Sequence, residues 1–82
     1  MAIKAIAFTT TARRSYRKLP PDVRDRIDKA LHRYRETGAG DVKVMVGGTC
    51  ARLRIGDFRA IFVETGDVIE VRAVGHRREI YR

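Results

Sequence analysis

The sequence predicts a small α+β domain in which a helical hairpin packs on one face of a mainly antiparallel sheet. Apolar residues recur at helical spacing near the N-terminus and alternate with polar residues from Asp41 onward. Proline and glycine pairs separate these stretches, and no long linker divides them. Because 82 residues are well below the length at which chains divide, we expect a single domain over residues 1–82.

The first expected elements are a strand and a short helix. Residues 3–8 alternate loosely between apolar and small or polar side chains, which is typical of a strand. The threonines at 9–11 can cap a helix, since a hydroxyl accepts a hydrogen bond from a free helical N–H. Ala12, Tyr16 and Leu19 then lie at helical spacing among basic residues, which indicates an amphipathic helix.

The prolines Pro20 and Pro21 separate this helix from a second one. Proline cannot continue a helix but suits the first turn of the next, where its missing N–H costs nothing. The second helix has one apolar stripe, formed by Val23, Ile27, Ala30, Leu31 and Tyr34. Gly38 and Gly40 are expected to end it, because glycine readily adopts the left-handed conformation after a helix.

The C-terminal half predicts an antiparallel meander. Residues 42–46 fit either a short strand or the approach to one. Three further strands are expected at residues 50–55, 58–63 and 68–74. Gly56-Asp57 is a hairpin turn signal between the first two of these strands, and residues 64–67 form the next turn. The element order is therefore β-α-α-β-β-β.

The charge of the chain points to an anionic partner. Eighteen Lys and Arg residues against ten Asp and Glu leave a net charge of +8, and most of the cations are arginines. Arginine binds phosphate with two parallel hydrogen bonds and stacks on bases, so this composition favours nucleic acid. A basic surface that docks onto an acidic protein fits the charge as well.

The sequence offers no signal for a membrane span, a secretory segment, a metal site, a disulfide or a bound cofactor. We expect no membrane association, because no run of about 18 apolar residues occurs. The N-terminus lacks the regions of a secretory signal, so we expect a cytoplasmic protein. Cys50 is the only cysteine, and it has no ligand spacing with His32 or His76, so we expect neither a metal nor a disulfide. No nucleotide-binding loop is present, and we expect no cofactor.

Three arginines of the expected hairpin form a candidate phosphate site. Arg52 and Arg54 point to the same face of their strand, because side chains alternate along it. If Gly56-Asp57 turns the chain tightly, Arg59 lies beside them on the neighbouring strand. Three adjacent guanidinium groups repel one another unless an anion lies among them, and a phosphate suits this role. Alternatively, each arginine is solvated separately on an exposed sheet face.

The C-terminal residues offer further groups for RNA chemistry. RNA cleavage by the 2′-hydroxyl requires its deprotonation, stabilisation of the phosphorane charge and protonation of the leaving 5′-oxygen. Arg77 and Arg78 can stabilise the charge, and His76 can act as acid or base near neutral pH. Tyr81 can exchange a proton in a cationic setting or stack on a base. The alternatives are a surface histidine and an aromatic residue that closes the core.

Residues 52–62, RLRIGDFRAIF, together with residues 74–81, VGHRREIY, resemble the RelE/ParE toxin family of type II toxin–antitoxin systems. Residues 12–20, ARRSYRKLP, are similar to the first helix of that family and its exit. The resemblance implies a β-α-α-β-β-β domain, which agrees with the pattern above. It also implies neutralisation by a cognate antitoxin protein with an extended, often acidic C-terminal segment.

The RelE branch of the family implies a metal-independent endoribonuclease that cuts mRNA in the ribosomal A site and inhibits translation. By this resemblance the catalytic residues are Arg52, Arg59, Arg77 and Tyr81, and the RNA-binding residues are Arg54, His76, Arg78 and Lys43. Arg52 stands where RelE members often have lysine, which keeps the charge but makes a poor general base.

Two other functions fit the same fold, because fold does not determine function. A toxin of the ParE branch inhibits DNA gyrase and needs no nuclease site. A third possibility is a non-catalytic basic partner of an antitoxin. The set of Arg59, Arg77 and Tyr81 favours the endoribonuclease, whose partners are the ribosome and mRNA.

Overall fold

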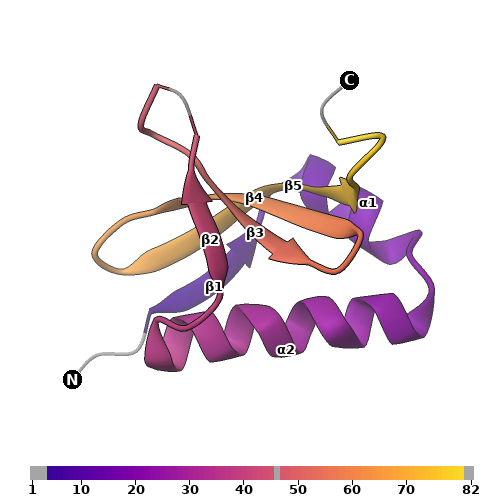
Figure 1. Cartoon of the computed structure of the whole chain (residues 1–82), viewed down its shortest axis with the longest axis horizontal. Helices are drawn as coiled ribbons and strands as arrows, with labels where there is room; N and C mark the ends of the chain where they lie inside the picture. Colours follow the sequence, from indigo (N-terminus) through magenta and orange to yellow (C-terminus); the bar gives the residue numbers. More distant parts are fainter. Residues whose placement is uncertain (1–3, 46, 81–82) are drawn as a thin grey trace.

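The computed structural model describes residues 4–45 and 47–80 and shows the predicted α+β class (Figure 1). Its elements are β1 (Ala5–Phe8), α1 (Thr10–Arg17), α2 (Pro21–Thr37), β2 (Asp41–Val44), β3 (Ala51–Ile55), β4 (Phe58–Glu64) and β5 (Val68–His76). The segment that the sequence left open near residue 42 forms the strand β2. The last strand extends to His76 rather than ending at Val74.

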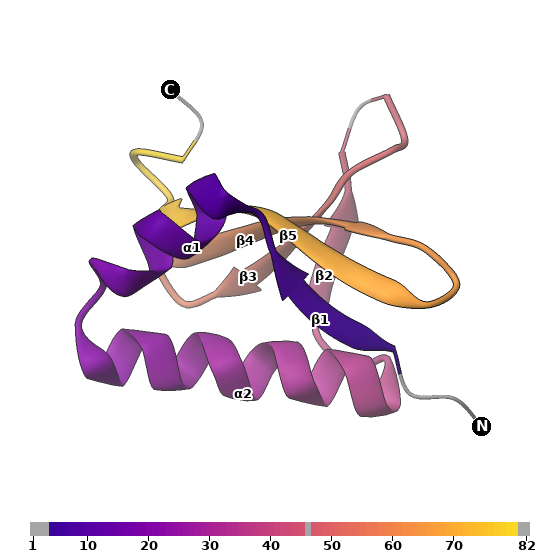
Figure 2. The same cartoon turned by 180° about the vertical axis from the view of Figure 1, so that it is seen from behind.

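The five strands form one sheet in the order β1-β5-β4-β3-β2. The strands β2 to β5 pair antiparallel, as the predicted meander requires, whereas β1 pairs parallel with β5. The first and last strands of the chain therefore lie side by side, as the view from behind shows (Figure 2). The two edges of the sheet are β1 and β2.

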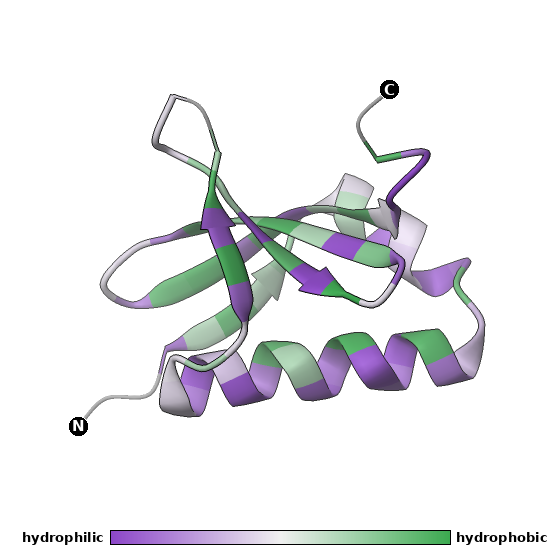
Figure 3. Ribbon diagram, in the orientation of Figure 1, coloured by the Kyte–Doolittle hydropathy of each residue, from purple (hydrophilic) through white to green (hydrophobic). Residues whose placement is uncertain are grey.

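Both helices contribute to one core on one face of the sheet. α1 packs against β5 and β1, and α2 packs against β3. The predicted stripe of α2 is confirmed, since Val23, Ile27 and Leu31 are buried there. They meet buried strand residues such as Leu53 and Phe62, and the apolar side of α2 faces the sheet (Figure 3). No helix in the described ranges has the length and apolar character needed to cross a membrane.

The helix ends follow the predicted signals. The Thr9 hydroxyl accepts a hydrogen bond from the Ala12 N–H at 3.1 Å and so caps α1. Pro21 occupies the first turn of α2. Gly38 ends α2 with a φ of 73°, and its N–H donates to the Tyr34 carbonyl at 2.8 Å.

Two tyrosine–carboxylate contacts join the helices to their neighbours. The Tyr16 hydroxyl of α1 donates to both carboxylate oxygens of Asp28 on α2, at 2.7 and 2.8 Å. The Tyr34 hydroxyl donates to Glu64 at 2.6 Å, and Glu64 also pairs with Lys4. Burial, and then the hydrogen bond to the carboxylate, raise the pKa of Tyr16 and of Tyr34 to about 12. Hydrogen bonds from Lys4 and Tyr34 lower the pKa of Glu64.

These tyrosines predict a loss of stability at alkaline pH. A tyrosine in the unfolded chain titrates near pH 10, whereas Tyr16 and Tyr34 titrate at about 12 in the folded chain. Their contribution is therefore fully present below pH 10 and declines as the pH rises toward 12. Urea unfolding across this range measures it, with a Tyr16→Phe/Tyr34→Phe variant as the reference. We expect the wild type to lose more stability than the variant; equal losses would contradict the assigned pKa shifts.

Candidate functional site

The pairing of β2, β3 and β4 brings cationic residues together on the sheet face away from the helices. Arg54 pairs directly with Arg59 across β3 and β4, and Lys43 pairs with Arg52 across β2 and β3. Directly paired residues project from the same face of a sheet, with their side chains about 5 Å apart at Cβ. The predicted grouping of Arg52, Arg54 and Arg59 on one face is therefore observed.

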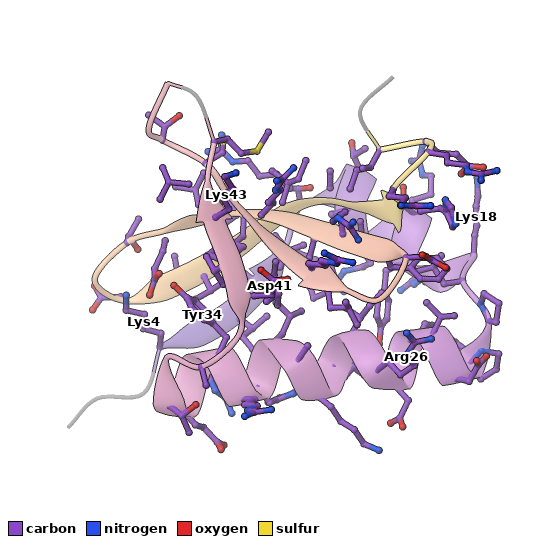
Figure 4. The ribbon with its side chains drawn as sticks, viewed as in Figure 1. Lys4, Lys18, Arg26, Tyr34, Asp41 and Lys43 are labelled. Carbon is purple, nitrogen blue, oxygen red and sulfur yellow. The ribbon has the colours of Figure 1, made fainter. Side chains whose placement is uncertain are left out.

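These residues line a hollow of about 550 Å³, which we call the arginine hollow. Its lining consists of Asp41, Lys43, Arg52, Arg54, Arg59, Arg77 and Arg78 (Asp41 and Lys43 are labelled in Figure 4). Cations from three strands and from the segment after β5 thus face a single volume, with Asp41 as the one carboxylate in its lining. This arrangement is suited to an anion with several oxygens, such as a phosphate group.

Arg59 is the most buried of the cations that line the arginine hollow. It is 9% exposed, and it is the buried charged residue of the described part of the chain. Its Nη1 donates to the carbonyl oxygens of Gly56 at 2.8 Å and Phe58 at 2.9 Å. The other N–H groups of the guanidinium have no acceptor among the described residues and remain available to an anion in the hollow. Arg59 therefore offers donors whose direction is set before a ligand arrives.

The turn between β3 and β4 holds both Arg59 and Arg77. Gly56 has a φ of 59° and no other residue of the turn has a positive φ, as a type II′ hairpin turn requires. The Gly56 carbonyl accepts from Arg59, and the Asp57 carbonyl accepts from the Arg77 N–H at 2.8 Å. The Asp57 carboxylate also lies 3.8 Å from the Arg77 Nε. One turn therefore fixes cations that are far apart in the sequence.

Replacing Gly56 with alanine is expected to destabilise the chain. The left-handed backbone costs an L-residue about 1–2 kcal/mol. The new Cβ would also meet the Arg26 guanidinium from α2 (Figure 4), but this far end of a flexible side chain can move aside at little cost. Urea unfolding of Gly56→Ala measures the loss. We expect the same loss when Gly56→Ala is introduced into an Arg26→Ala background, because the backbone cost stays after the Arg26 contact is removed. Stability equal to wild type in Gly56→Ala would contradict this description of the turn.

Two carboxylates, one in the lining of the arginine hollow and one beside it, lie close to its cations and partly balance their charge. Asp41 lies 4.0 Å from Arg54, and Asp57 lies 3.8 Å from Arg77. All four side chains are at least half exposed, and exposed pairs of this kind contribute about 1 kcal/mol or less. An incoming phosphate therefore competes with weak partners. No motif in the sequence points to Asp41, whose role depends on its position opposite Arg54 on the neighbouring strand.

His76 lies outside the arginine hollow. Its ring packs edge-on against Phe58 at 5.4 Å, and its Nδ1 accepts a hydrogen bond from the Arg78 N–H at 3.1 Å. It lines a separate volume of about 430 Å³ between α1 and the end of β5, which we call the tail groove. The observed contacts give His76 a local role in holding the segment after β5. Tyr81, the remaining predicted site residue, lies outside the described residues.

The described residues contain no group of three or more His, Cys, Asp or Glu side chains that could hold a metal ion. The arginine hollow is lined by guanidinium and ammonium groups and by the Asp41 carboxylate. Its cations can bind and stabilise negative charge, but an always-protonated guanidinium is a poor proton acceptor.

The family model described as the ParE toxin of type II toxin–antitoxin system, parDE, matches residues 6–81. The chain belongs to the RelE/ParE toxin family. It is thus a toxin of the type II toxin–antitoxin class, as the sequence motifs predicted. No curated protein matches this RelE/ParE toxin by sequence.

Solved structures of the family share the fold of this RelE/ParE toxin. The RelB–RelE antitoxin–toxin complex of Methanococcus jannaschii matches with a TM-score of 0.75 and 26% identity, over 92% of this chain and 94% of the other. The YoeB dimer of Staphylococcus aureus matches with a TM-score of 0.77 and 16% identity, over 92% of this chain and 98% of the other. The archaeal RelE–RelB complex of Pyrococcus horikoshii OT3 matches with a TM-score of 0.77 and 17% identity, over 94% of this chain and 98% of the other.

Proposed function

We propose that this RelE/ParE toxin is a ribosome-dependent endoribonuclease that cuts mRNA in the A site and so inhibits translation. The observation that carries the proposal is the arginine hollow, in which several cations surround Arg59, whose guanidinium is held in place by two backbone carbonyl oxygens. The likeness to the RelE chain of the Methanococcus jannaschii complex supports the same branch. The solved relatives in complex with RelB support a cognate antitoxin as the partner that neutralises the toxin.

The proposed reaction joins the 2′-oxygen of a nucleotide to the adjacent phosphorus and breaks the bond from phosphorus to the 5′-oxygen. The proton of the 2′-hydroxyl is removed, and the leaving 5′-oxygen receives a proton. Arg59 stabilises the added negative charge of the phosphorane, since its donors are already directed into the hollow. Arg52 and Arg77 neutralise the same group, while Lys43, Arg54 and Arg78 hold the neighbouring backbone.

We assign proton transfer to Tyr81, which would take the proton of the 2′-hydroxyl and return it to the 5′-oxygen, because the guanidinium and ammonium groups of the arginine hollow are poor proton acceptors. A tyrosine ordinarily titrates near pH 10, and adjacent cations lower the pKa of such a hydroxyl. In this proposal His76 supports the site indirectly, through its hydrogen bond to the Arg78 N–H.

Inhibition of DNA gyrase is the second candidate function. The family model that matches residues 6–81 is that of the ParE toxin, and this observation favours the gyrase target. Such a toxin would use the basic surface for protein or DNA contact, without any need for the preset donors of Arg59.

Two assays with the purified toxin test the proposal. In the first, ribosomes programmed with a defined message are incubated with the toxin, and the message ends are mapped. In the second, gyrase supercoils a relaxed plasmid in the presence of the toxin. We expect cleavage that requires ribosomes, with unimpaired supercoiling. Intact message with inhibited supercoiling would replace the proposal with the gyrase function.

A further inference from the structure

A second group of cations lies on α1, outside the arginine hollow. The group consists of Arg13, Arg14, Arg17 and Lys18, which we call the α1 basic face. All four residues are exposed and line a hollow of about 350 Å³ together with Thr10. α1 itself contains no acidic residue. Within the described ranges, none of the four side chains forms an ion pair.

The α1 basic face continues toward the arginine hollow around the end of β5. Lys18 lines the tail groove together with His76 and Glu79. The intervening residues Arg77 and Arg78 line the arginine hollow on the other side of the same segment. Figure 4 shows Lys18 at the end of the molecule where this segment leaves β5. Cations thus follow one another from the arginine hollow, across the segment after β5, to α1.

We propose that the α1 basic face binds the sugar–phosphate backbone of the same RNA strand whose scissile phosphate lies in the arginine hollow. This inference rests on the proposed nuclease function and extends it to a second contact on the strand. A single phosphate cannot occupy both places, whereas a strand carries one negative charge per nucleotide along its whole length. The four cations lie within about two turns of helix, so the ligand needs a similarly dense charge.

Arginine predominates on this face, and its planar fork matches phosphate oxygens. An acidic polypeptide segment is the competing occupant. RNA is favoured because the cations continue directly from the proposed catalytic hollow, which the substrate strand must already occupy.

The test compares two variants that each remove two positive charges from a helix surface. Arg14→Gln/Lys18→Gln alters the α1 basic face, and Lys29→Gln/Arg33→Gln alters the exposed side of α2 as the matched control. The probes are a tetramer and a hexadecamer of 2′-O-methyl uridine, which cannot be cleaved. Fluorescence anisotropy at several salt concentrations gives the affinity and its salt dependence for each pair of protein and probe.

For the hexadecamer, we expect the α1 variant to lower the slope of log affinity against log salt by about 1.4, since each lost phosphate contact removes about 0.7. For the tetramer, which the arginine hollow can hold alone, we expect wild-type affinity. The α2 control is expected to match the wild type with both probes.

Several results would overturn the inference. Equal losses in the α1 and α2 variants would show an effect of net charge alone. An unchanged slope, accompanied by weaker binding of a polyglutamate probe, would assign the face to an acidic polypeptide. In either case, ribosome-dependent cleavage by the wild type would leave the proposed function intact. Absence of such cleavage would instead remove the nuclease function, whatever the binding slopes are.

Discussion

Replacing Arg59 with alanine is expected to lower the rate of message cleavage by about 10²–10³, as removal of one preset donor to a developing charge does. The reason is the position of its guanidinium, which is held by the carbonyl oxygens of Gly56 and Phe58 and faces the arginine hollow. Single-turnover cleavage on programmed ribosomes measures the rate. Growth after induction of the variant gives the corresponding loss of toxicity.

The same substitution removes two hydrogen bonds from a largely buried residue, so its effect on folding must be measured separately. Hydrogen bonds from charged groups contribute about 1.5–3 kcal/mol each, and urea unfolding reports their loss. Arg59→Lys keeps the positive charge but lacks the planar fork. We expect Arg59→Lys to fold and to remain strongly impaired in cleavage. A folded Arg59→Ala variant with wild-type cleavage would remove Arg59 from the site.

The second large effect is expected for Arg77→Ala, with a loss of about 10² or more in the cleavage rate and little change in stability. The Arg77 side chain is 50% exposed and lies 3.8 Å from Asp57, so its removal leaves the core intact. Its cation nevertheless lines the arginine hollow opposite the strand residues. The measurement is again single-turnover cleavage, together with the midpoint of urea unfolding.

Arg72→Ala is the matched control for Arg77→Ala. Arg72 lies nearby on β5, is 53% exposed and pairs with Glu70, but it does not line the arginine hollow. We expect it to cut messages at the wild-type rate. Equal impairment of the two variants would mean that the general positive charge, rather than the arginine hollow, supports the activity.

Local patterns in the sequence predict most of the element boundaries in this fold. Pro21 and Gly38 bound α2 because their backbone preferences act within one turn of the helix. Gly56-Asp57 predicts a tight hairpin, and the hairpin places Arg54 opposite Arg59. The grouping of arginines on one face follows from this register and from the alternation of side chains along a strand.

Long-range features of the sheet have no comparable local signal. The parallel pairing of β1 with β5 depends on which distant segments meet in the core. The register of β4 and β5 also shifts between Ile61 and Phe62, so that Phe62 pairs with Val71 and Ile61 with Ala73. As a result, Val71 and Val74 are both buried although three positions separate them, which strict alternation does not predict.

In the candidate site, too, some features follow from local sequence patterns and others depend on long-range contacts. The sequence predicts the cations of the hairpin, but it does not show that the Asp57 carbonyl binds the Arg77 N–H. His76 is next to Arg77 in the sequence, yet its ring turns toward Phe58 and the tail groove. The direction of a side chain beyond the end of a strand depends on tertiary contacts, so its neighbours in the sequence do not determine it.

The most direct test of the central claim is primer extension on cellular mRNA after brief expression of the toxin, with Arg59→Ala beside it. We predict cuts that follow the codon phase in the wild type and disappear in the variant. Such cuts would establish ribosome-dependent cleavage that depends on the arginine hollow. Intact messages in cells whose growth is arrested would contradict the nuclease function and point to gyrase as the target.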